Sequence, residues 1–282
     1  MIALKGDEYN IFLPARDDNT HKGDFGTLAI VAGSSCYQGA AYFATKAALH
    51  SGVGIVVSFI PDSIYNAFAC KINGAVIEPL NSVSGCICDD DLTERILHRR
   101  STAVLCGCGL GFNDNALKIV TDVLSLPLAV VIDGDGLSAL SLNLSLLKRE
   151  HPTVLTPHMG EFSRLCGMSI ENIKAEREHI LRDFCVKHNC FTVLKDSISL
   201  ICTPTGEMYS LSYPCSALSK GGSGDVLAGM LSSFIAQGIP LLDSMVAAVT
   251  LHNTCGRMAA EQFGKRGCQP DDYISMLRTL KV

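Results

Sequence analysis

Short apolar runs rich in β-branched residues alternate with longer segments of helical periodicity along almost the whole chain. The runs predict strands at residues 27–31, 54–59, 103–106, 128–132, 153–155 and 191–194, followed by a hairpin near 198–211. The longer segments predict helices near residues 39–51, 115–125, 142–150, 173–188, 225–237 and 243–263. Because strands and helices alternate, the pattern predicts a doubly wound α/β fold.

The strand expected at residues 128–132 contains no polar position. A continuous apolar strand suits a mostly parallel central sheet with helices on both faces. No repeat, low-complexity tract or Pro/Ser/Gly-rich linker interrupts the alternation, so residues 1–282 are expected to form a single domain. Ligands of such sheets bind beyond the carboxyl ends of the strands, and the motifs described below all follow strand ends.

A glycine-rich motif, Gly-Gly-Ser-Gly-Asp at residues 221–225, opens the helix expected at 225–237. Glycines before a helix let backbone N–H groups point at an anion, and the helix dipole adds to that field. Asp225 lies in the first turn, where its carboxylate can act as a base beside the anion, and the combination indicates phosphoryl transfer. The alternative is a tight turn in which Asp225 only caps the helix. The motif is not a Walker A loop, since no Gly-Lys-Ser/Thr ends it.

A second motif, Thr-Pro-His-Met-Gly-Glu at residues 156–161, comes directly after the strand at 153–155 and starts a helix. His158 and Glu161 are three residues apart, so both side chains can face one pocket. We expect His158 to contact a ligand. The alternatives are that His158 caps the helix and that Glu161 only complements the helix dipole.

Two carboxylates, Asp133 and Asp135, alternate with glycines after the strand at 128–132. Such a pair can hold Mg²⁺ through waters and substrate phosphates, or it can form a turn that caps the next helix. The metal ligands therefore stay open, with Asp133 and Glu161 as weak candidates. Lys195 ends the strand at 191–194, where it can meet a nucleotide phosphate; exposure to solvent is the alternative.

Composition narrows the class of protein. Hydrophobic residues make up 48% of the 282 residues and charged residues 18%, which is typical of a globular chain with apolar surface. Apolar surface favours self-association, so a homo-oligomer such as a tetramer is expected. The net charge of −5 and the scattered lysines and arginines argue against a nucleic-acid partner. With no signal peptide and no run of about 18 apolar residues, a cytoplasmic protein without membrane segments is expected.

Thirteen cysteines are present, an odd number in a long chain without an export signal. We therefore expect buried, reduced thiols rather than disulfides. Two Cys-x-Cys pairs, Cys86 with Cys88 and Cys106 with Cys108, offer zinc binding as an alternative. The spacing is weak support for zinc, because neither pair has a matching second pair of cysteines or histidines.

Taken together and in this order, the motifs resemble those of the ADP/ATP-dependent NAD(P)H-hydrate dehydratases, a branch of the ribokinase-like superfamily. The resemblance covers nearly the whole chain and is carried by residues 22–26, 32–34, 39–40, 107–111, 155–161 and 221–229. The glycine-rich motif by itself is shared with several small-molecule kinases. Combined with Leu-Thr-Pro-His-Met-Gly-Glu, it is much more specific. The resemblance implies a ribokinase-like fold.

The resemblance also implies a function, the repair of hydrated NADH and NADPH. A nucleotide, with Mg²⁺, phosphorylates the ring hydroxyl, and loss of phosphate then restores the cofactor. By this analogy Asp225 is the catalytic base, and the hydrated dinucleotide is bound by Ala40, Gly111, His158 and Asp225. The adenine nucleotide is bound by Lys195, Asp196, Ser197, Ile198, Ser199, Gly222, Ser223 and Gly224. ADP is expected as the co-substrate, with ATP able to take its place.

Two other functions stay open at this point: a ribokinase-like kinase of a hydroxymethyl vitamin precursor, and a nucleotide-binding protein without turnover. Two departures from the family motivate the second. Asp196 stands where family members commonly have glycine. Its carboxylate is expected to repel nucleotide phosphates, or else to point away into solvent. Residues 213–220 lack the Gly-Asn expected there. The chain leaves no room for the N-terminal epimerase domain of many bacterial relatives, so a dehydratase domain alone is expected.

Overall fold

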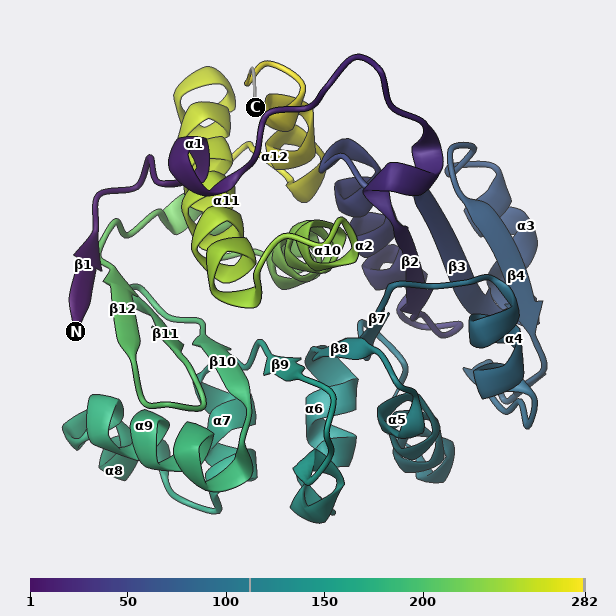
Figure 1. The fold of residues 1–282 in the computed structure, drawn as a ribbon, viewed down its shortest axis with the longest axis horizontal. Helices are drawn as coiled ribbons and strands as arrows, with labels where there is room; N and C mark the ends of the chain where they lie inside the picture. The colour runs from purple at the N-terminus through teal and green to yellow at the C-terminus, as the bar shows by residue number, and fades with distance from the viewer. Residues whose placement is uncertain (112, 281–282) are drawn as a thin grey trace.

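The computed structural model describes residues 1–111 and 113–280, and it is built around one large sheet (Figure 1). The strands of this sheet are β1 (Ile2–Leu4), β2 (Thr27–Val31), β3 (Ile55–Pro61), β4 (Val76–Leu80), β7 (Ala103–Cys106), β8 (Ala129–Ile132), β9 (Thr153–Leu155), β10 (Phe191–Leu194), β11 (Ser199–Cys202) and β12 (Met208–Leu211). Their order is β1-β12-β11-β10-β9-β8-β7-β2-β3-β4. A separate hairpin pairs β5 (Ser82–Val83) with β6 (Cys86–Ile87).

The sheet is mostly parallel, as the apolar strands predict. Every pair from β4 to β10 is parallel, and so is the edge pair of β1 and β12. Only β11 runs antiparallel to both of its neighbours, because it forms the expected hairpin with β12. The carboxyl ends of β7, β8, β9 and β10 therefore lie along one edge, where ligands bind in sheets of this kind.

Helices cover both faces of the sheet, as expected for a doubly wound fold (Figure 1). One face carries α1 (Tyr9–Phe12), α2 (Gln38–His50), α3 (Tyr65–Ala69), α10 (Ser223–Ala236), α11 (Leu241–Phe263) and α12 (Pro270–Leu277). The other carries α4 (Leu92–His98), α5 (Asp114–Ser125), α6 (Gly134–Leu140), α7 (Met159–Cys166), α8 (Ile170–Ala175) and α9 (Arg177–His188). The short 3-10 helices are η1 (Lys22–Phe25), η2 (Asp62–Ile64), η3 (Leu144–Leu147) and η4 (Ser216–Leu218).

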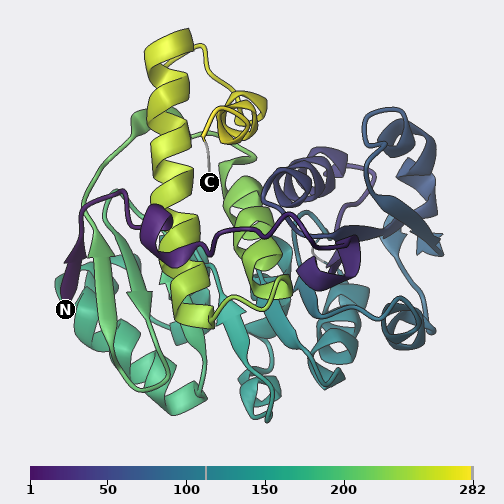
Figure 2. The same cartoon turned by 45° about the horizontal axis from the view of Figure 1, so that its top comes forward.

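The N-terminal segment crosses in front of α11 before the chain enters β2 (Figure 2). It is fastened there by α1, which packs on α11, and by the Thr254 hydroxyl, which donates to the Gly6 carbonyl at 3.1 Å. Within the described residues, no helix combines the length and the apolar character that crossing a membrane would need.

Helix α10 is nearly all buried and packs closely on α2. The approach is tightest at Gly229, where an added Cβ would lie 2.2 Å from the carbonyl oxygen of Ala44. Only glycine fits where the two helices cross, because a side chain at this position would overlap with the backbone of Ala44. A backbone carbonyl, unlike a side chain, cannot change its rotamer to make room. The close contact fixes the height of α10 above the sheet, and hence the position of its glycine-led N-terminus.

Gly229→Ala is expected to destabilise the fold by about 1–3 kcal/mol, the usual cost of overpacking a core. Steric overlap outweighs the gain of about 1 kcal/mol in helix propensity that alanine offers over glycine. Chemical denaturation of both proteins measures the difference. Gly221→Ala is the matched control, since among the described residues no heavy atom lies within 4 Å of a Cβ added there. Equal stability of the two variants would contradict the packing argument.

Two expected helices are wrong in extent. The segment 142–150 holds only the single turn η3, because the Asn143 side chain accepts a hydrogen bond from the Ser145 backbone N–H and caps a turn, while the regular helix α6 comes earlier. The segment 173–188 is two helices rather than one. The chain leaves helical geometry at Glu176 (φ −132°, ψ 37°), between α8 and α9.

Several elements carried too weak a pattern to be predicted. The edge strands β1 and β4 are short, and β4 contains a glutamate and a proline. Their strand character depends on pairing with a neighbour, which local periodicity does not contain. Helices α3, α4 and α12 have five, seven and eight residues, too few to give a firm periodic pattern.

Candidate functional site

The ends of β8, β9 and β10 bring three of the sequence motifs together beside the N-terminus of α10. Asp133 directly follows β8, the segment from Thr156 to His158 follows β9, and Lys195 follows β10. The last two segments pair like a short extension of the sheet, with the Lys195 backbone N–H donating to the Pro157 carbonyl at 2.8 Å. The strand order thus concentrates charged side chains that lie far apart in the sequence.

An ion pair between Lys195 and Asp133 lies at the centre of the site. The Lys195 Nζ is 2.6 Å from the Asp133 Oδ1, and the Thr156 hydroxyl donates to the same oxygen at 2.6 Å. The Asp133 side chain is 4% exposed and that of Lys195 19%. Burial lowers the pKa of Lys195, but Asp133 and Glu161 outweigh it, so the pKa lies above its ordinary value. Lys195 is therefore a fixed positive charge.

Asp225 lies in the first turn of α10, as the glycine motif predicts, although the helix already begins at Ser223. Burial and then nearby Asp133 raise the pKa of its carboxyl, while the Cys108 thiol and Lys195 lower it, and the resulting pKa is about 7. A carboxylate with this pKa is poised to exchange a proton at neutral pH, which is what a general base requires.

The N-terminus of α10 is open towards the same site. Gly222 precedes the helix with φ 94°, a conformation that glycine adopts without strain, and no side chain of the described residues caps the terminus. A Cβ added to Gly224 would lie 3.1 Å from the Lys195 Nζ, so the ammonium group sits against the first turn. Helix dipole and ammonium together make a binding site for an anion.

His158 and Glu161 form a reciprocal cap on α7. The His158 Nδ1 accepts hydrogen bonds from the backbone N–H groups of Gly160 (2.9 Å) and Glu161 (3.3 Å), and the Glu161 Oε2 accepts one from the His158 N–H (2.7 Å). The capping alternative is therefore realised. Because Nδ1 is an acceptor, the ring proton of neutral His158 lies on Nε2. Burial, then Lys195, lower the pKa of His158, whereas burial raises that of Glu161 to about 7.

A cavity of about 620 Å³ opens beside Lys195 and the N-terminus of α10, large enough for a small-molecule ligand. It is lined by His158 and by six of the residues expected to bind the nucleotide, namely Lys195, Asp196, Ser197, Ser199, Ser223 and Gly224. Ile198 and Gly222 are not among its lining residues. The cavity therefore unites most of the expected nucleotide site, although the two halves lie in different motifs.

The other expected substrate-binding residues lie outside this cavity, around the glycine loop after β7. A Cβ on Gly109 of this loop would lie 2.8 Å from that of Ala40, and the Gly111 N–H donates to the Asp135 Oδ2 at 2.8 Å. The loop reaches Asp225 through Cys108, whose sulfur lies within 4.8 Å of carboxylate oxygens of both Asp133 and Asp225. Asp225 is thus near both groups of expected ligand contacts.

Two residues at the cavity were missed in the sequence. His252, on α11, places its Nε2 3.3 Å from the Ser223 hydroxyl, and burial lowers its pKa to about 4, so it is neutral. Lys220 donates from Nζ to the carbonyls of Arg266 (2.6 Å) and Cys268 (2.5 Å). These hydrogen bonds restrain the start of the glycine motif. The sequence held only slight signals for these two residues. His252 is a single histidine in an apolar helix, and Lys220 directly precedes the glycine motif.

The carboxylate of Asp196 is paired with a cation, which the sequence did not predict. Its Oδ2 lies 3.2 Å from the Arg177 Nη1, and its Oδ1 accepts a hydrogen bond from the Ser197 N–H at 2.8 Å. Arg177, at the start of α9, offsets the negative charge that Asp196 adds to the cavity. The sequence did not reveal this partner because it lies on another element.

The two candidate metal ligands, Asp133 and Glu161, differ in the contacts that their carboxylate oxygens already make. Asp133 directs Oδ1 at Lys195 and Thr156, so a cation and a hydroxyl already use that oxygen. Glu161 uses Oε2 for the α7 cap, and its Oε1 lies 3.4 Å from the His158 Nε2. Within the described residues, the one compact group of metal-binding side chains is Cys108, Asp133 and Asp225. A thiol does not suit Mg²⁺, and neither Cys-x-Cys pair forms a zinc site of its own.

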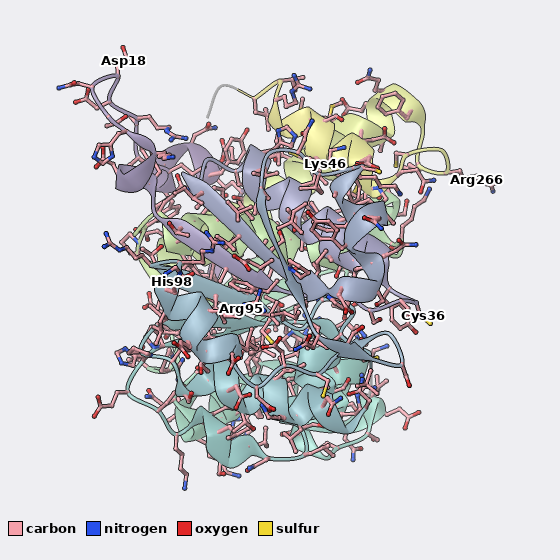
Figure 3. The ribbon with its side chains drawn as sticks, turned by 90° about the vertical axis from the view of Figure 1, so that its right-hand side faces the viewer. Asp18, Cys36, Lys46, Arg95, His98 and Arg266 are labelled. Atoms are coloured by element: carbon pink, nitrogen blue, oxygen red, sulfur yellow. The ribbon has the colours of Figure 1, made fainter. Side chains whose placement is uncertain are left out.

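All thirteen cysteines are free thiols, as expected, but their predicted burial is only partly right. Seven are buried, whereas Cys36, Cys70 and Cys88 are exposed. Cys36 extends outward from the loop between β2 and α2 (Figure 3). These three thiols lie in connecting segments at the surface, where no described helix or strand packs over them.

A second hollow, of about 360 Å³, lies between β4 and α4 and is lined by Glu78, Asp91, Glu94, Arg95, His98 and Arg99. Arg95 and His98 project at this side of the molecule (Figure 3). Arg95 binds Glu78 at 2.6 Å, and Arg99 pairs with the same carboxylate. Since its cations are already paired, this hollow does not fit a nucleotide.

Comparisons with known proteins identify the family of the chain. The family model described as NAD(P)H-hydrate dehydratase matches residues 28–279. The bifunctional NAD(P)H-hydrate repair enzyme Nnr of Thermofilum pendens is 35% identical over 260 residues, which cover 90% of this chain and 49% of the relative. The ADP-dependent (S)-NAD(P)H-hydrate dehydratase of Neisseria meningitidis serogroup B is 31% identical over 256 residues, covering 89% of this chain and 82% of the relative. The chain spans about half the length of the bifunctional relatives.

Solved structures show the same architecture. The ADP/ATP-dependent NAD(P)H-hydrate dehydratase of Bacillus subtilis, co-crystallized with ATP/Mg²⁺, superposes with a TM-score of 0.83 at 24% identity, covering 98% of this chain and 95% of that chain. A ribokinase-like superfamily protein of Enterococcus faecalis V583 gives 0.86 at 24% identity, with 99% and 94% covered. The fold is therefore ribokinase-like. With the family model matching almost its whole length, this chain belongs to the NAD(P)H-hydrate dehydratase family.

Proposed function

We propose that this protein restores NADH and NADPH from their hydrated forms in a reaction driven by ADP, with ATP able to replace ADP. The observation that carries the proposal is Asp225, a carboxylate with a pKa of about 7 in the first turn of a glycine-led helix, beside the Lys195 ammonium. This arrangement combines a base with an anion site. Membership of the dehydratase family favours this function over a vitamin-precursor kinase.

The nucleotide is proposed to bind in the cavity, against Lys195, Asp196, Ser197, Ser199, Ser223 and Gly224. Ile198 and Gly222, which adjoin these residues in the chain, complete the proposed nucleotide site. The hydrated dinucleotide is proposed to bind Ala40, Gly111, His158 and Asp225. Support comes from the position of Asp225 between the glycine loop after β7 and the cavity. A substrate hydroxyl at Asp225 would then face a phosphate held at the N-terminus of α10.

In the proposed reaction, Asp225 removes the proton of the ring hydroxyl while that oxygen attacks the terminal phosphorus of ADP. The bond from this phosphorus to the bridging oxygen breaks, and AMP leaves. Phosphate then departs from the ring carbon, the neighbouring carbon loses a proton, and the ring double bond returns. The N–H groups of α10 and the Lys195 ammonium stabilise charge on the transferring phosphoryl group.

The site residues fit a magnesium ion that is held mainly by the nucleotide. Glu161 is buried, and its Oε1 has only the His158 Nε2, at 3.4 Å, as a neighbour among the ion pairs of the described residues. Oxygen ligands with several waters suit Mg²⁺. Burial raises the pKa values of two carboxyls, Glu161 and Asp225, to about 7, although the Lys195 ammonium opposes the rise. Bound with the phosphates, Mg²⁺ would neutralise charge on them.

A coupled assay tests the proposal. Hydrated NADH is mixed with the protein, Mg²⁺ and either ADP or ATP at equal concentration, and the absorbance of reduced nicotinamide is followed. Recovery that needs the nucleotide supports dehydration, and the faster nucleotide is the co-substrate. No recovery with either nucleotide, together with a stable phosphorylated product from a thiazole or pyrimidine alcohol, would show a kinase instead.

Arg177→Met is expected to raise the KM for the nucleotide by a factor of roughly ten or less, because it unmasks the Asp196 carboxylate at the cavity. The effect should shrink as salt rises. Adding Asp196→Asn should return KM to near the original value. Arg182→Met, on the same helix, is the matched control, since Arg182 binds only the Gly206 carbonyl among the described residues. An unchanged KM at low salt would mean that Asp196 does not face the phosphates.

Two further proposals concern the cellular compartment and the oligomeric state of the protein. Free thiols at all thirteen cysteines support a reducing compartment such as the cytoplasm. A homo-oligomer such as a tetramer stays a prediction, supported by exposed apolar side chains that include Ile11 and Leu142. Light scattering coupled to size-exclusion chromatography measures the mass directly, and a monomer across the working concentrations would overturn it.

A further inference from the structure

Helix α11 turns one side towards the nucleotide cavity. Val249, His252 and Asn253 are three and four residues apart, so they share this side of the helix, and all three line the cavity. The Asn253 side chain donates to the Tyr213 carbonyl at 2.7 Å. His252 differs from the other two because its ring contacts Ser223, at the glycine-led N-terminus of α10 where the phosphates are proposed to bind.

The ring of His252 is held between Ser223 and Tyr273. Its Nε2 lies 3.3 Å from the Ser223 hydroxyl oxygen. On Tyr273 the ring packs edge to face, with the ring centroids 6.2 Å apart and an interplanar angle of 88°. Tyr273 is fully buried, and its hydroxyl donates to the Ala217 carbonyl. Because Tyr273 is itself fixed in this way, it holds the imidazole against Ser223.

Ser223 is placed to contact an anion directly. It is the first residue of α10, and it lines the cavity together with Gly224 and Lys195. Its hydroxyl can add one hydrogen bond to those that the backbone N–H groups of the helix offer. A hydroxyl has a single proton, however, so this bond forms only if no other acceptor takes that proton.

The contact between His252 and Ser223 allows two arrangements. If Nε2 is unprotonated, it accepts the Ser223 proton, and the hydroxyl turns only its lone pairs towards the phosphates. If Nε2 carries the ring proton, it donates to the Ser223 Oγ, and the hydroxyl proton is free for a phosphate oxygen. A bound anion favours the second arrangement, because it attracts the proton and is repelled by the lone pairs.

We propose that His252 is a positioning residue of the nucleotide site: its Nε2–H group donates to the Ser223 Oγ and thereby directs the Ser223 hydroxyl proton at a phosphate of the bound nucleotide. The inference deepens the proposed function and rests on it, since it requires the phosphates to lie at the N-terminus of α10. His252 acts on the phosphates through Ser223.

The surroundings of His252 keep its ring neutral. Burial, followed by Lys195, lowers the pKa of His252 to about 4, against an opposing backbone contact with Ser223. At neutral pH the ring therefore has one N–H group to donate and no charge. His252 thus supplies direction to the site, while the positive charge comes from Lys195.

The variants His252→Gln and His252→Met test the donor. The two new side chains have similar length and shape, but only glutamine offers an amide N–H group. His252→Met is expected to weaken ADP binding by about three- to tenfold, the contribution of one hydrogen bond, whereas His252→Gln should stay within about twofold of the wild type. Titration calorimetry with ADP and Mg²⁺, without the hydrated dinucleotide, measures the affinities in the absence of turnover.

The same pair of variants in a Ser223→Ala background shows whether His252 acts through the serine. Without the hydroxyl, His252→Met and His252→Gln should bind ADP equally, because the group that they orient is gone. A packing role of His252 would leave the difference between the two variants in place. A difference that persists in Ser223→Ala, or equal affinities with Ser223 intact, would overturn the inference.

Thr250→Val is the matched control. Thr250 is fully buried on α11, two residues before His252, and its hydroxyl donates to the Val246 carbonyl of the same helix at 2.8 Å. Its loss should lower stability in chemical denaturation and leave the affinity for ADP unchanged. If Thr250→Val weakens ADP binding as much as His252→Met does, any disturbance of α11 has this effect and the inference is wrong.

A spectroscopic measurement is independent of these affinities. The ¹⁵N chemical shifts of labelled histidine rings report which nitrogen carries the proton, and the His252 signals are identified by their loss in His252→Gln. The ADP-bound protein is expected to show the Nε2–H form. An Nδ1–H form with ADP bound would overturn the inference and leave the proposed function standing. If the wild-type protein binds neither ADP nor ATP, the proposed function fails, and the inference fails with it.

Discussion

Replacing Asp225 with asparagine is expected to lower kcat by about 10²–10⁴-fold, the contribution typical of a general base. The amide cannot accept the hydroxyl proton, but it has the size of the carboxylate. The fold should persist, because burial keeps the carboxyl at a pKa of about 7 and a neutral group costs less to bury there. Nucleotide affinity should stay the same or rise, since the change removes a negative charge near the phosphates.

Steady-state kinetics with hydrated NADH, together with nucleotide binding by calorimetry, measures both effects. Asp243→Asn is the matched control. Asp243 is also a first-turn carboxylate, at the start of α11, but it lies outside the cluster that Asp225 forms with Cys108 and Asp133. It should keep nearly full activity. An Asp225→Asn enzyme that retains more than about a third of the wild-type rate would show that another group is the base.

Removing the central cation is expected to have the largest effect on stability. Lys195→Met leaves the buried Asp133 carboxylate without its partner at 2.6 Å, and breaking such a pair typically costs about 3–5 kcal/mol. The partial exposure of Lys195 puts the expectation at the lower end of that range. Methionine preserves the length and the apolar stem of the side chain, so the loss reports the charge.

The loss should depend on pH, with a direction set by the neighbouring acids. Glu161 and Asp225 have folded-state pKa values of about 7, above their ordinary values, so the folded protein takes up protons as the pH falls through 7. Below that pH fewer negative charges need the Lys195 ammonium. The stability difference between Lys195→Met and the wild type should therefore be greatest above pH 7 and smaller near pH 5.

Chemical denaturation at several pH values measures this difference. Lys118→Met is the matched control, because Lys118 pairs with Asp122 at 2.8 Å on the surface of a helix, where an ion pair contributes about 0.5 kcal/mol or less. Adding Asp133→Asn to Lys195→Met should recover part of the lost stability. If Lys195→Met costs no more than Lys118→Met at any pH, Lys195 does not compensate the buried acids.

The fold was largely predictable because its cause is local. Apolar runs such as 128–132 and helical periodicity such as 243–263 follow from side chains within one or two turns of each other, and both elements are present. The errors occur where local and tertiary preferences disagree. At 142–150, the Asn143 side chain caps a turn and ends the helical pattern. The edge strand β4 is extended because β3 pairs with it.

The candidate site was predictable as separate motifs. Glycines before a helix, a carboxylate in its first turn and a lysine at a strand end each have a chemical meaning that the sequence carries by itself. Asp225, His158 and Lys195 could be named in this way. The resemblance to a family then suggested the proposed substrates, and the family model matches residues 28–279.

The partners of these residues came only from the tertiary structure. The sequence placed Lys195 after one strand and Asp133 after another, but their ion pair depends on β8, β9 and β10 lying side by side. The pairing of Asp196 with Arg177 and the position of Cys108 beside Asp225 have the same origin.

The sequence by itself therefore determined the α/β class, and it named the strand ends of the candidate site and the proposed base. The tertiary structure decided which charges neutralise one another and hence the pKa of each acid. The physical reason is that periodicity and turn chemistry act over a few neighbouring residues. Burial and charge pairing depend instead on the strand order, which brings distant segments to one edge of the sheet.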